Sequence, residues 1–161
     1  MDGSNIPFAD IERNMQELDT INRLLGGHQI TIRGVEKILE SVIDKPEVFH
    51  IVELGSGGGD NLRVLKKWAQ KHSVNAYFTG IDVNAECVAF AKSQPQNEGI
   101  QFICSDYKTV VFHQPPHIIF SSLFCHHFSH DDLVQMMQWK FKNATSGFFI
   151  NDLQRHPLAY H

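Results

Sequence analysis

The stretch that decides the fold runs from residue 52 to residue 60 and reads Val52-Glu53-Leu54-Gly55-Ser56-Gly57-Gly58-Gly59-Asp60. A β-prone apolar run enters this stretch, a helical pattern leaves it, and glycines fill the turn between them. Glycine lets a backbone turn sharply and lets a ligand lie against bare peptide. The pattern therefore favours a nucleotide-type pocket, and an ordinary flexible loop is the alternative.

The chain on either side of this turn has two kinds of pattern. Before it, apolar residues at helical spacing in 11–25 and 32–43 predict two helices, which we interpret as an N-terminal helical cap over 1–46. After it, β-prone runs alternate with helical patterns, and the strands are expected at 48–52, 76–82, 100–104, 117–121 and 148–151. Such alternation predicts an α/β fold, a doubly wound Rossmann-like parallel sheet covered on both faces. We expect residues 47–161 to form the ligand-binding core, the part that would bind a cofactor, within a single domain over 1–161.

Length and composition narrow the function classes. The chain has 161 residues, 42% of them hydrophobic and 20% charged, which is typical of one globular domain. The net charge of −4 disfavours a general nucleic-acid binder. No run approaches the roughly 20 apolar residues that cross a bilayer, and the polar N-terminus does not resemble a signal peptide. Three scattered cysteines fit reduced thiols, so we expect a cytoplasmic protein.

The residues at the glycine turn discriminate between nucleotide ligands. A dinucleotide fingerprint, G-x-G-x-x-G/A, would need a small residue at the position of Asp60, where a carboxylate would face a pyrophosphate. The Gly-Lys-Ser/Thr ending of a P-loop is absent from this turn. Glu53 and Asp60, which flank the glycines, suit a ligand that carries positive charge and no phosphate. A nicotinamide oxidoreductase is therefore disfavoured.

The run Glu53-x-Gly55-x-Gly57-x-Gly59 resembles motif I of the class I S-adenosylmethionine-dependent methyltransferases. The resemblance implies the strand order 3-2-1-4-5, a ribose contact for Asp82, an adenine contact for Asp106, and packing of Tyr107 on the adenine. Helix capping or turn formation is the alternative for the two aspartates. The cofactor-binding residues expected for S-adenosyl-L-methionine are Glu53, Gly55, Ser56, Gly57, Gly59, Asp60, Asp82, Val83, Asp106, Tyr107 and Ser121.

The segment after the fourth strand, residues 120–128, is similar to the post-strand motif of small-molecule methyltransferases, including the ubiquinone and menaquinone type. The resemblance implies that Ser121 and Ser122 face the cofactor and that His126 or His127 is the catalytic base. Imidazole accepts a proton near neutral pH. The alternatives are structural packing of these histidines and a metal site at Cys125, His126, His127 and His130. We predict no metal, because adjacent residues of an extended segment point in opposite directions.

These observations favour methyl transfer to a small, largely apolar acceptor of phenolic, quinol or polyketide-like type, by O- or C-methylation. A non-catalytic S-adenosylmethionine-binding module, or a fragment without its acceptor site, is the alternative. The family's sheet normally ends in two antiparallel strands, whereas this chain stops at His161 soon after the fifth strand. We expect those strands to be missing, with 155–160 the start of a further element. A possible homodimer would cover the open edge at 148–150.

Overall fold

The computed structural model describes residues 8–24 and 26–152, without the side chains of Phe8, Ile11, Leu18, Ile21, Leu24 and His127. The helices are α1 (Phe8–Leu24), α2 (Gly27–Ser41), α3 (Asp60–Lys71), α4 (Ala85–Ser93) and α5 (His130–Asn143), with short 3-10 turns η1 (Pro95–Asn97), η2 (Tyr107–Thr109) and η3 (Cys125–His127). The strands are β1 (Phe49–Leu54), β2 (Ala76–Asp82), β3 (Ile100–Cys104), β4 (Ile118–Ser122) and β5 (Gly147–Asn151). The element predicted at 155–160 lies outside the described residues.

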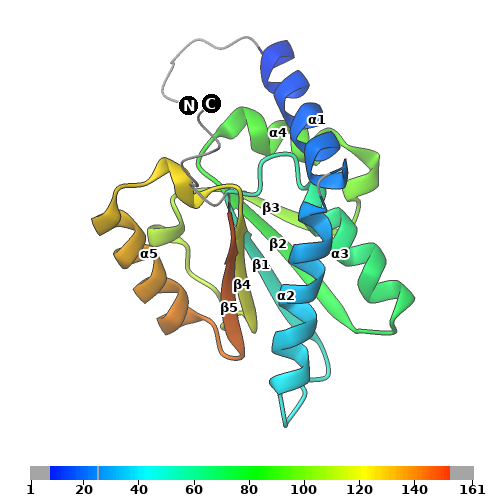
Figure 1. The fold of residues 1–161 in the computed structure, drawn as a ribbon, viewed down its shortest axis with the longest axis vertical. Coiled ribbons are helices and arrows are strands. Elements are labelled where there is room, and N and C mark those ends of the chain that lie inside the picture. The colour runs from blue at the N-terminus through cyan, green and yellow to red at the C-terminus, as the bar shows by residue number, and fades with distance from the viewer. Residues whose placement is uncertain (1–7, 25, 153–161) are drawn as a thin grey trace.

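The strands of the described part form one parallel sheet in the order β3-β2-β1-β4-β5, which confirms the predicted order (Figure 1). All six residues of β1 are buried, as its central place in a sheet covered on both faces requires. Because the strands are parallel, their carboxyl ends meet at one edge, where ligands of open α/β sheets bind. The turn at residues 55–59 lies at that edge.

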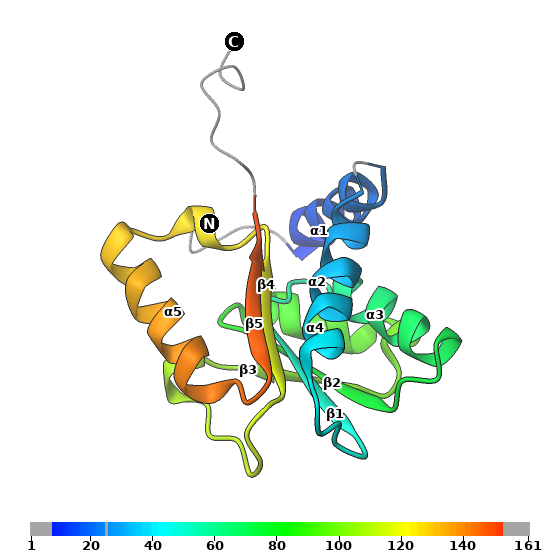
Figure 2. The same ribbon diagram turned by 60° about the horizontal axis from the view of Figure 1, so that its bottom comes forward.

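Two apolar layers hold helices against the two faces of the sheet. On one face, Val35 of α2, Leu62 of α3 and Val88 of α4 join a core cluster with β-strand residues. On the other face, Met136 of α5 packs with Val52 and Ile119 in a second cluster. Figures 1 and 2 show α5 on one side of β4 and β5, with α2 and α3 on the other side of the sheet. The doubly wound architecture is therefore confirmed.

The two N-terminal helices have different surroundings. α2 buries Ile32, Val35 and Leu39 against the sheet layer, whereas α1 lies toward the carboxyl edge near α4 (Figure 1). Side-chain caps mark the starts of two helices: Asn84 accepts hydrogen bonds from the first turn of α4, and Ser129 accepts one from the Asp132 amide in α5. No helix of the described residues is long and apolar enough to cross a membrane.

Candidate active site

The glycine turn between β1 and α3 is built from left-handed backbone. Gly55, Gly57 and Gly59 have φ values of +70°, +48° and +77°, which side-chain-bearing residues rarely adopt. The amides of Gly55 and Ser56 donate to the carbonyl of Ile81, so the turn is tied to the end of β2. This backbone requirement explains the glycines and places bare peptide at the carboxyl edge of the sheet.

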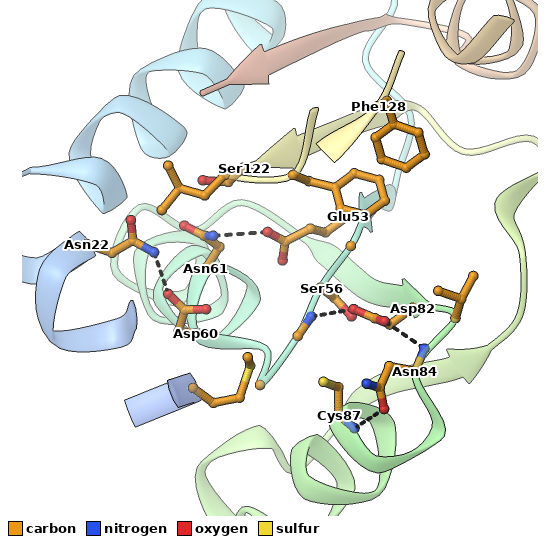
Figure 3. A pocket seen from close by; sticks show the side chains of 17 residues that line it. Asn22, Glu53, Ser56, Asp60, Asn61, Asp82, Asn84, Cys87, Ser122 and Phe128 are labelled. Atoms are coloured by element: carbon orange, nitrogen blue, oxygen red, sulfur yellow. Dashed lines mark hydrogen bonds between the residues drawn. The ribbon is translucent and has the colours of Figure 1, made fainter. Parts of the chain in front are cut away.

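A cavity of about 360 Å³ opens over this turn, in the size range of small-molecule sites (Figure 3). Its walls come from four regions: α1, the β1–α3 turn, the β2–α4 junction and the segment after β4. The lining residues are Met15, Asn22, Glu53, Gly55, Ser56, Gly57, Gly58, Asp60, Asn61, Asp82, Val83, Asn84, Cys87, Ser122, Leu123, Phe124 and Phe128. The cavity therefore joins a polar acidic floor to an apolar wall.

Glu53 forms the most deeply buried acidic group of the cavity and is 1% exposed. Its Oε1 accepts a hydrogen bond of 3.0 Å from the Asn61 amide, as Figure 3 shows, and its Oε2 has no partner within the described residues. Burial, followed by the charge of Asp60, raises the pKa of Glu53 well above its usual value. A buried oxygen without a partner is costly, so this position calls for a donor or a cation from a ligand.

Asp82 closes β2 and organises the neighbouring turns. Its Oδ2 accepts from the Gly57 amide at 2.9 Å and its Oδ1 accepts from the Asn84 amide at 2.9 Å (Figure 3). Each carboxylate oxygen has two lone pairs, so each can accept a further hydrogen bond. Asp82 is thus both a fixed part of the turn and a potential acceptor for ligand hydroxyls.

Asp60 connects the cavity to the N-terminal helices. Its Oδ2 accepts from the Asn22 amide at 3.0 Å and from His28 Nε2 at 2.8 Å. Burial raises the pKa of Asp60, but the hydrogen bonds from His28 and Asn22 outweigh burial and bring the pKa below its usual value. Asp60 therefore stays ionised and holds the junction of α1 and α2 against the start of α3.

The segment after β4 supplies the apolar wall. The Phe124 and Phe128 rings pack edge to face with centroids 4.8 Å apart. A side chain at Gly55 would overlap the Phe124 ring, so this ring lies directly on the glycine turn. Leu123 has a positive φ of 50°, a strained conformation for a leucine. The wall is thus a tight turn that presents aromatic and aliphatic surface to the cavity.

The structure brings together most, but not all, of the predicted cofactor-binding residues. The predicted residues that line the cavity are Glu53, Gly55, Ser56, Gly57, Asp60, Asp82 and Val83. Gly59 lies behind the turn, against Phe102. Whether any of these residues contacts a cofactor stays a prediction.

Three of the predicted residues lie away from the cavity lining. Asp106 caps η2 by accepting from the Lys108 amide. The Tyr107 ring is buried in the second core cluster, edge to face with Trp139, because η2 turns it toward α5. Ser121 faces α5 and accepts a hydrogen bond of 2.6 Å from Lys140. The neighbouring Ser122 lines the cavity instead, since adjacent strand residues point to opposite faces.

The predicted histidines lie in η3, beside the apolar wall. His126 Nδ1 is 2.9 Å from Asp152 Oδ1, and its backbone amide donates to Asp152 Oδ2. The side chain of His127 lies outside the described residues. Cys125 belongs to the metal site that was considered as an alternative. It is buried in the second core cluster, and its Sγ lies 3.3 Å from Ser121 Oγ. The base assignment therefore stays a prediction for both histidines.

Several site residues were not predicted. Asn22 and His28 come from the N-terminal helices, and no local pattern links them to Asp60 more than thirty residues later. Asn61 directly follows Asp60 at the end of the glycine motif, and this position is the signal that could have identified it as a site residue. Lys140 follows Met136 by four residues on α5, and that spacing places both on the buried face. Lys140 is 0% exposed, and burial lowers its pKa to about 8.

Comparison with known families assigns the chain. A family model described as methyltransferase domain matches residues 51–143, more than half of the sequence, so the chain belongs to the methyltransferase domain family. This confirms the resemblance to class I S-adenosylmethionine-dependent methyltransferases, whereas the ubiquinone and menaquinone subgroup stays a prediction. No match was found among curated proteins.

Solved structures share the fold. The plantazolicin methyltransferase BpumL in complex with SAH is 23% identical with a TM-score of 0.68, and the match covers 91% of this chain and 53% of that chain. DhpI, in its SAH complex, is 18% identical with a TM-score of 0.62, and the match covers 92% of this chain and 68% of that chain. SAM-bound CalS10, an amino pentose methyltransferase from Micromonospora echinaspora, is 10% identical with a TM-score of 0.63. The match covers 79% of this chain and 51% of that chain. The chain thus spans about half the length of BpumL and CalS10.

Proposed function

We propose that this domain binds S-adenosyl-L-methionine in the cavity at the glycine turn and transfers its methyl group to a small, largely apolar acceptor. The observation that carries the proposal is the unpartnered Oε2 of buried Glu53. An ammonium group placed there supplies both a hydrogen-bond donor and a compensating charge. Three carboxylates line the same cavity, those of Glu53, Asp60 and Asp82, which disfavours a phosphate-bearing ligand.

The remaining cavity residues fit the other parts of this ligand. Asp82 has acceptor capacity for ribose hydroxyls, and bare peptide at Gly57 allows close approach. BpumL and DhpI were crystallised with SAH and CalS10 with SAM, which supports the same ligand class here. When bound, the sulfonium supplies an electrophilic methyl group whose departure leaves a neutral thioether, so no acid is needed. The contribution of this chain is therefore alignment and exclusion of water.

The acceptor proposal rests on the apolar wall. Leu123, Phe124 and Phe128 present aliphatic and aromatic surface beside the acidic floor, and Met15 of α1 also lines the cavity. Such surface suits a phenolic, quinol or polyketide-like molecule, methylated on oxygen or carbon. His126 is the candidate proton acceptor for a hydroxyl, with His127 as the second candidate.

Calorimetric titration and a turnover screen test the proposal in sequence. S-adenosylhomocysteine is expected to bind and NAD is not, and the opposite preference would contradict the cofactor assignment. Turnover is then measured with labelled S-adenosylmethionine and a panel of small phenols and quinols. Methylation of a panel member supports the proposal, whereas binding with no methylation of any member supports the non-catalytic module instead.

A further inference from the structure

Side chains from three different helices converge beside the cavity. Asp19 of α1, His28 of α2 and Asp60 of α3 each bring one possible metal-ligand atom to within 4.8 Å of the other two. His28 Nε2 lies 2.8 Å from Asp60 Oδ2 and 3.7 Å from Asp19 Oδ1. The imidazole is buried and both carboxylates are partly buried. A nitrogen ligand therefore lies between two oxygen ligands, away from the metal site considered at residues 125–130.

The hydrogen bonds of this cluster leave one of its carboxylates poorly satisfied. Nε2 can carry one proton, and the shorter distance assigns that proton to the hydrogen bond with Asp60. Among the described residues, Asp19 accepts one hydrogen bond, from Arg63 to Oδ2, and its length of 3.5 Å makes it weak. Asp19 Oδ1 therefore faces the imidazole across 3.7 Å without sharing a proton. A cation between the three atoms would contact all of them.

The neighbouring polar groups orient the two carboxylates toward this point. Asn22 donates to Asp60 at 3.0 Å, as Figure 3 shows. Arg63 contacts Oδ2 of Asp19, which leaves Oδ1 on the side of His28. Carboxylates that bind metals are commonly held by hydrogen bonds of this kind, which fix their direction. The charge of Arg63 opposes a nearby cation, but the two carboxylates outweigh it.

We propose that Asp19, His28 and Asp60 form a binding site for a divalent cation of the zinc type. Zn²⁺ binds imidazole nitrogen and carboxylate oxygen tetrahedrally at about 2.0–2.2 Å, which separates neighbouring ligand atoms by roughly 3.4 Å. The two separations measured from Nε2 lie on either side of that value. The cation replaces the Nε2 proton, which is released to solvent, and water fills the fourth position. Mg²⁺ is disfavoured because it prefers oxygen ligands alone.

A cation at this site joins the N-terminal helices to the core. α1 and α2 supply one ligand each, and the third ligand is the first residue of α3, directly after the glycine turn. Asp60 and Asn22 also line the cavity, so the cation fixes the part of the cavity wall where α1 meets α3. Because only the folded chain brings the three ligands together, binding should raise the melting temperature. Cation binding requires no S-adenosylmethionine and stands apart from the proposed function.

Zinc titration of the full chain by calorimetry, after treatment with a chelator, tests the proposal. One Zn²⁺ per chain is expected to bind and to raise the melting temperature, whereas Mg²⁺ is expected to do neither. Asp19→Ala should weaken zinc binding by at least about tenfold, the loss typical when only a hydrogen-bond partner of a ligand is removed. The Asp19 side chain is 43% exposed, so this variant is expected to fold. Asp10→Ala, at an exposed position of α1, is the matched control and should bind zinc like wild type.

Cobalt distinguishes this site from zinc bound at other positions of a chain with ten histidines. Co²⁺ is paramagnetic and strongly shifts the proton NMR signals of an imidazole that binds it. Such a shifted signal is expected in the wild type, lost in His28→Gln and kept in His113→Gln, a control in an exposed loop. Absence of zinc binding by the wild type, an affinity unchanged in Asp19→Ala, or a shifted signal that persists in His28→Gln would each overturn the proposal.

Discussion

Replacing Glu53 by glutamine tests the electrostatics of the cavity. The substitution keeps an oxygen for the Asn61 hydrogen bond and removes the charge at the unpartnered Oε2. One charge-assisted hydrogen bond to a ligand ammonium is lost, which is worth about 1.5–3 kcal/mol. At 1.4 kcal/mol for each factor of ten, S-adenosylmethionine should bind roughly 10- to 150-fold more weakly. Glu40→Gln, on the exposed part of α2, is the matched control and should bind like wild type.

The pH dependence of binding gives the sharper readout. Because burial and Asp60 raise the pKa of Glu53, this carboxylate takes up a proton at a higher pH than an ordinary glutamate, and a bound cation must displace that proton. Wild-type affinity should therefore increase as pH rises through that pKa, by up to about tenfold per pH unit, with proton release measurable by calorimetry in buffers of different ionisation enthalpy. The amide side chain introduced by Glu53→Gln has no proton to release, so the variant's profile should lack this increase. Equal affinities and parallel profiles for wild type and Glu53→Gln would refute the reasoning.

The other predictions concern the turn, the ribose contact and the buried lysine. Asp82→Ala should weaken S-adenosylmethionine binding by about 1–3 kcal/mol through unpaired ribose hydroxyls, and unchanged calorimetric affinity would remove that assignment. Gly26→Ala, at φ +78° with open space around it, should lower the free energy of unfolding in urea by about 1–2 kcal/mol. Gly55→Ala should lower the free energy of unfolding by about 1–3 kcal/mol more than Gly26→Ala does, because its added methyl group also meets the Phe124 ring. Equal losses for the two variants would contradict the packing described. Lys140 has a pKa of about 8 in the native state and about 10.4 in the unfolded chain. Between these two pH values the unfolded chain binds more protons than the native protein. The free energy of unfolding should therefore rise with pH in this range, by up to about 3 kcal/mol. Lys140→Met should remove that rise, measured by denaturant unfolding at pH 7–10, and a variant with the wild-type slope would count against it.

The strands and the glycine turn could be predicted because their signals are local. Continuous apolar runs and the glycines at 55–59 define the β1–α3 junction without reference to the rest of the chain. The end of β4 shows the limit of this reasoning. Ser121 and Ser122 are both small and polar, and the alternation of a strand sends one to Lys140 and the other to the cavity. The resemblance implied that both serines face the cofactor, whereas the structure places only Ser122 in the cavity lining.

The contacts that organise the site are mostly between distant positions. Asn22 and His28 reach Asp60 across more than thirty residues, and Asp152 reaches His126 across 26. No motif spacing encodes such pairs, because they depend on how helices and neighbouring strands pack. Tyr107 illustrates the same point in reverse: it follows an acidic residue as an adenine-stacking residue would, yet the direction of η2 buries it against Trp139.

A crystal structure of the protein with S-adenosylhomocysteine tests the central claim most directly. The account predicts that the amino group lies within hydrogen-bond distance of Glu53 Oε2 and that the ribose hydroxyls contact Asp82. Electron density for the ligand elsewhere, or a bound ligand whose amino group points away from Glu53, would contradict it.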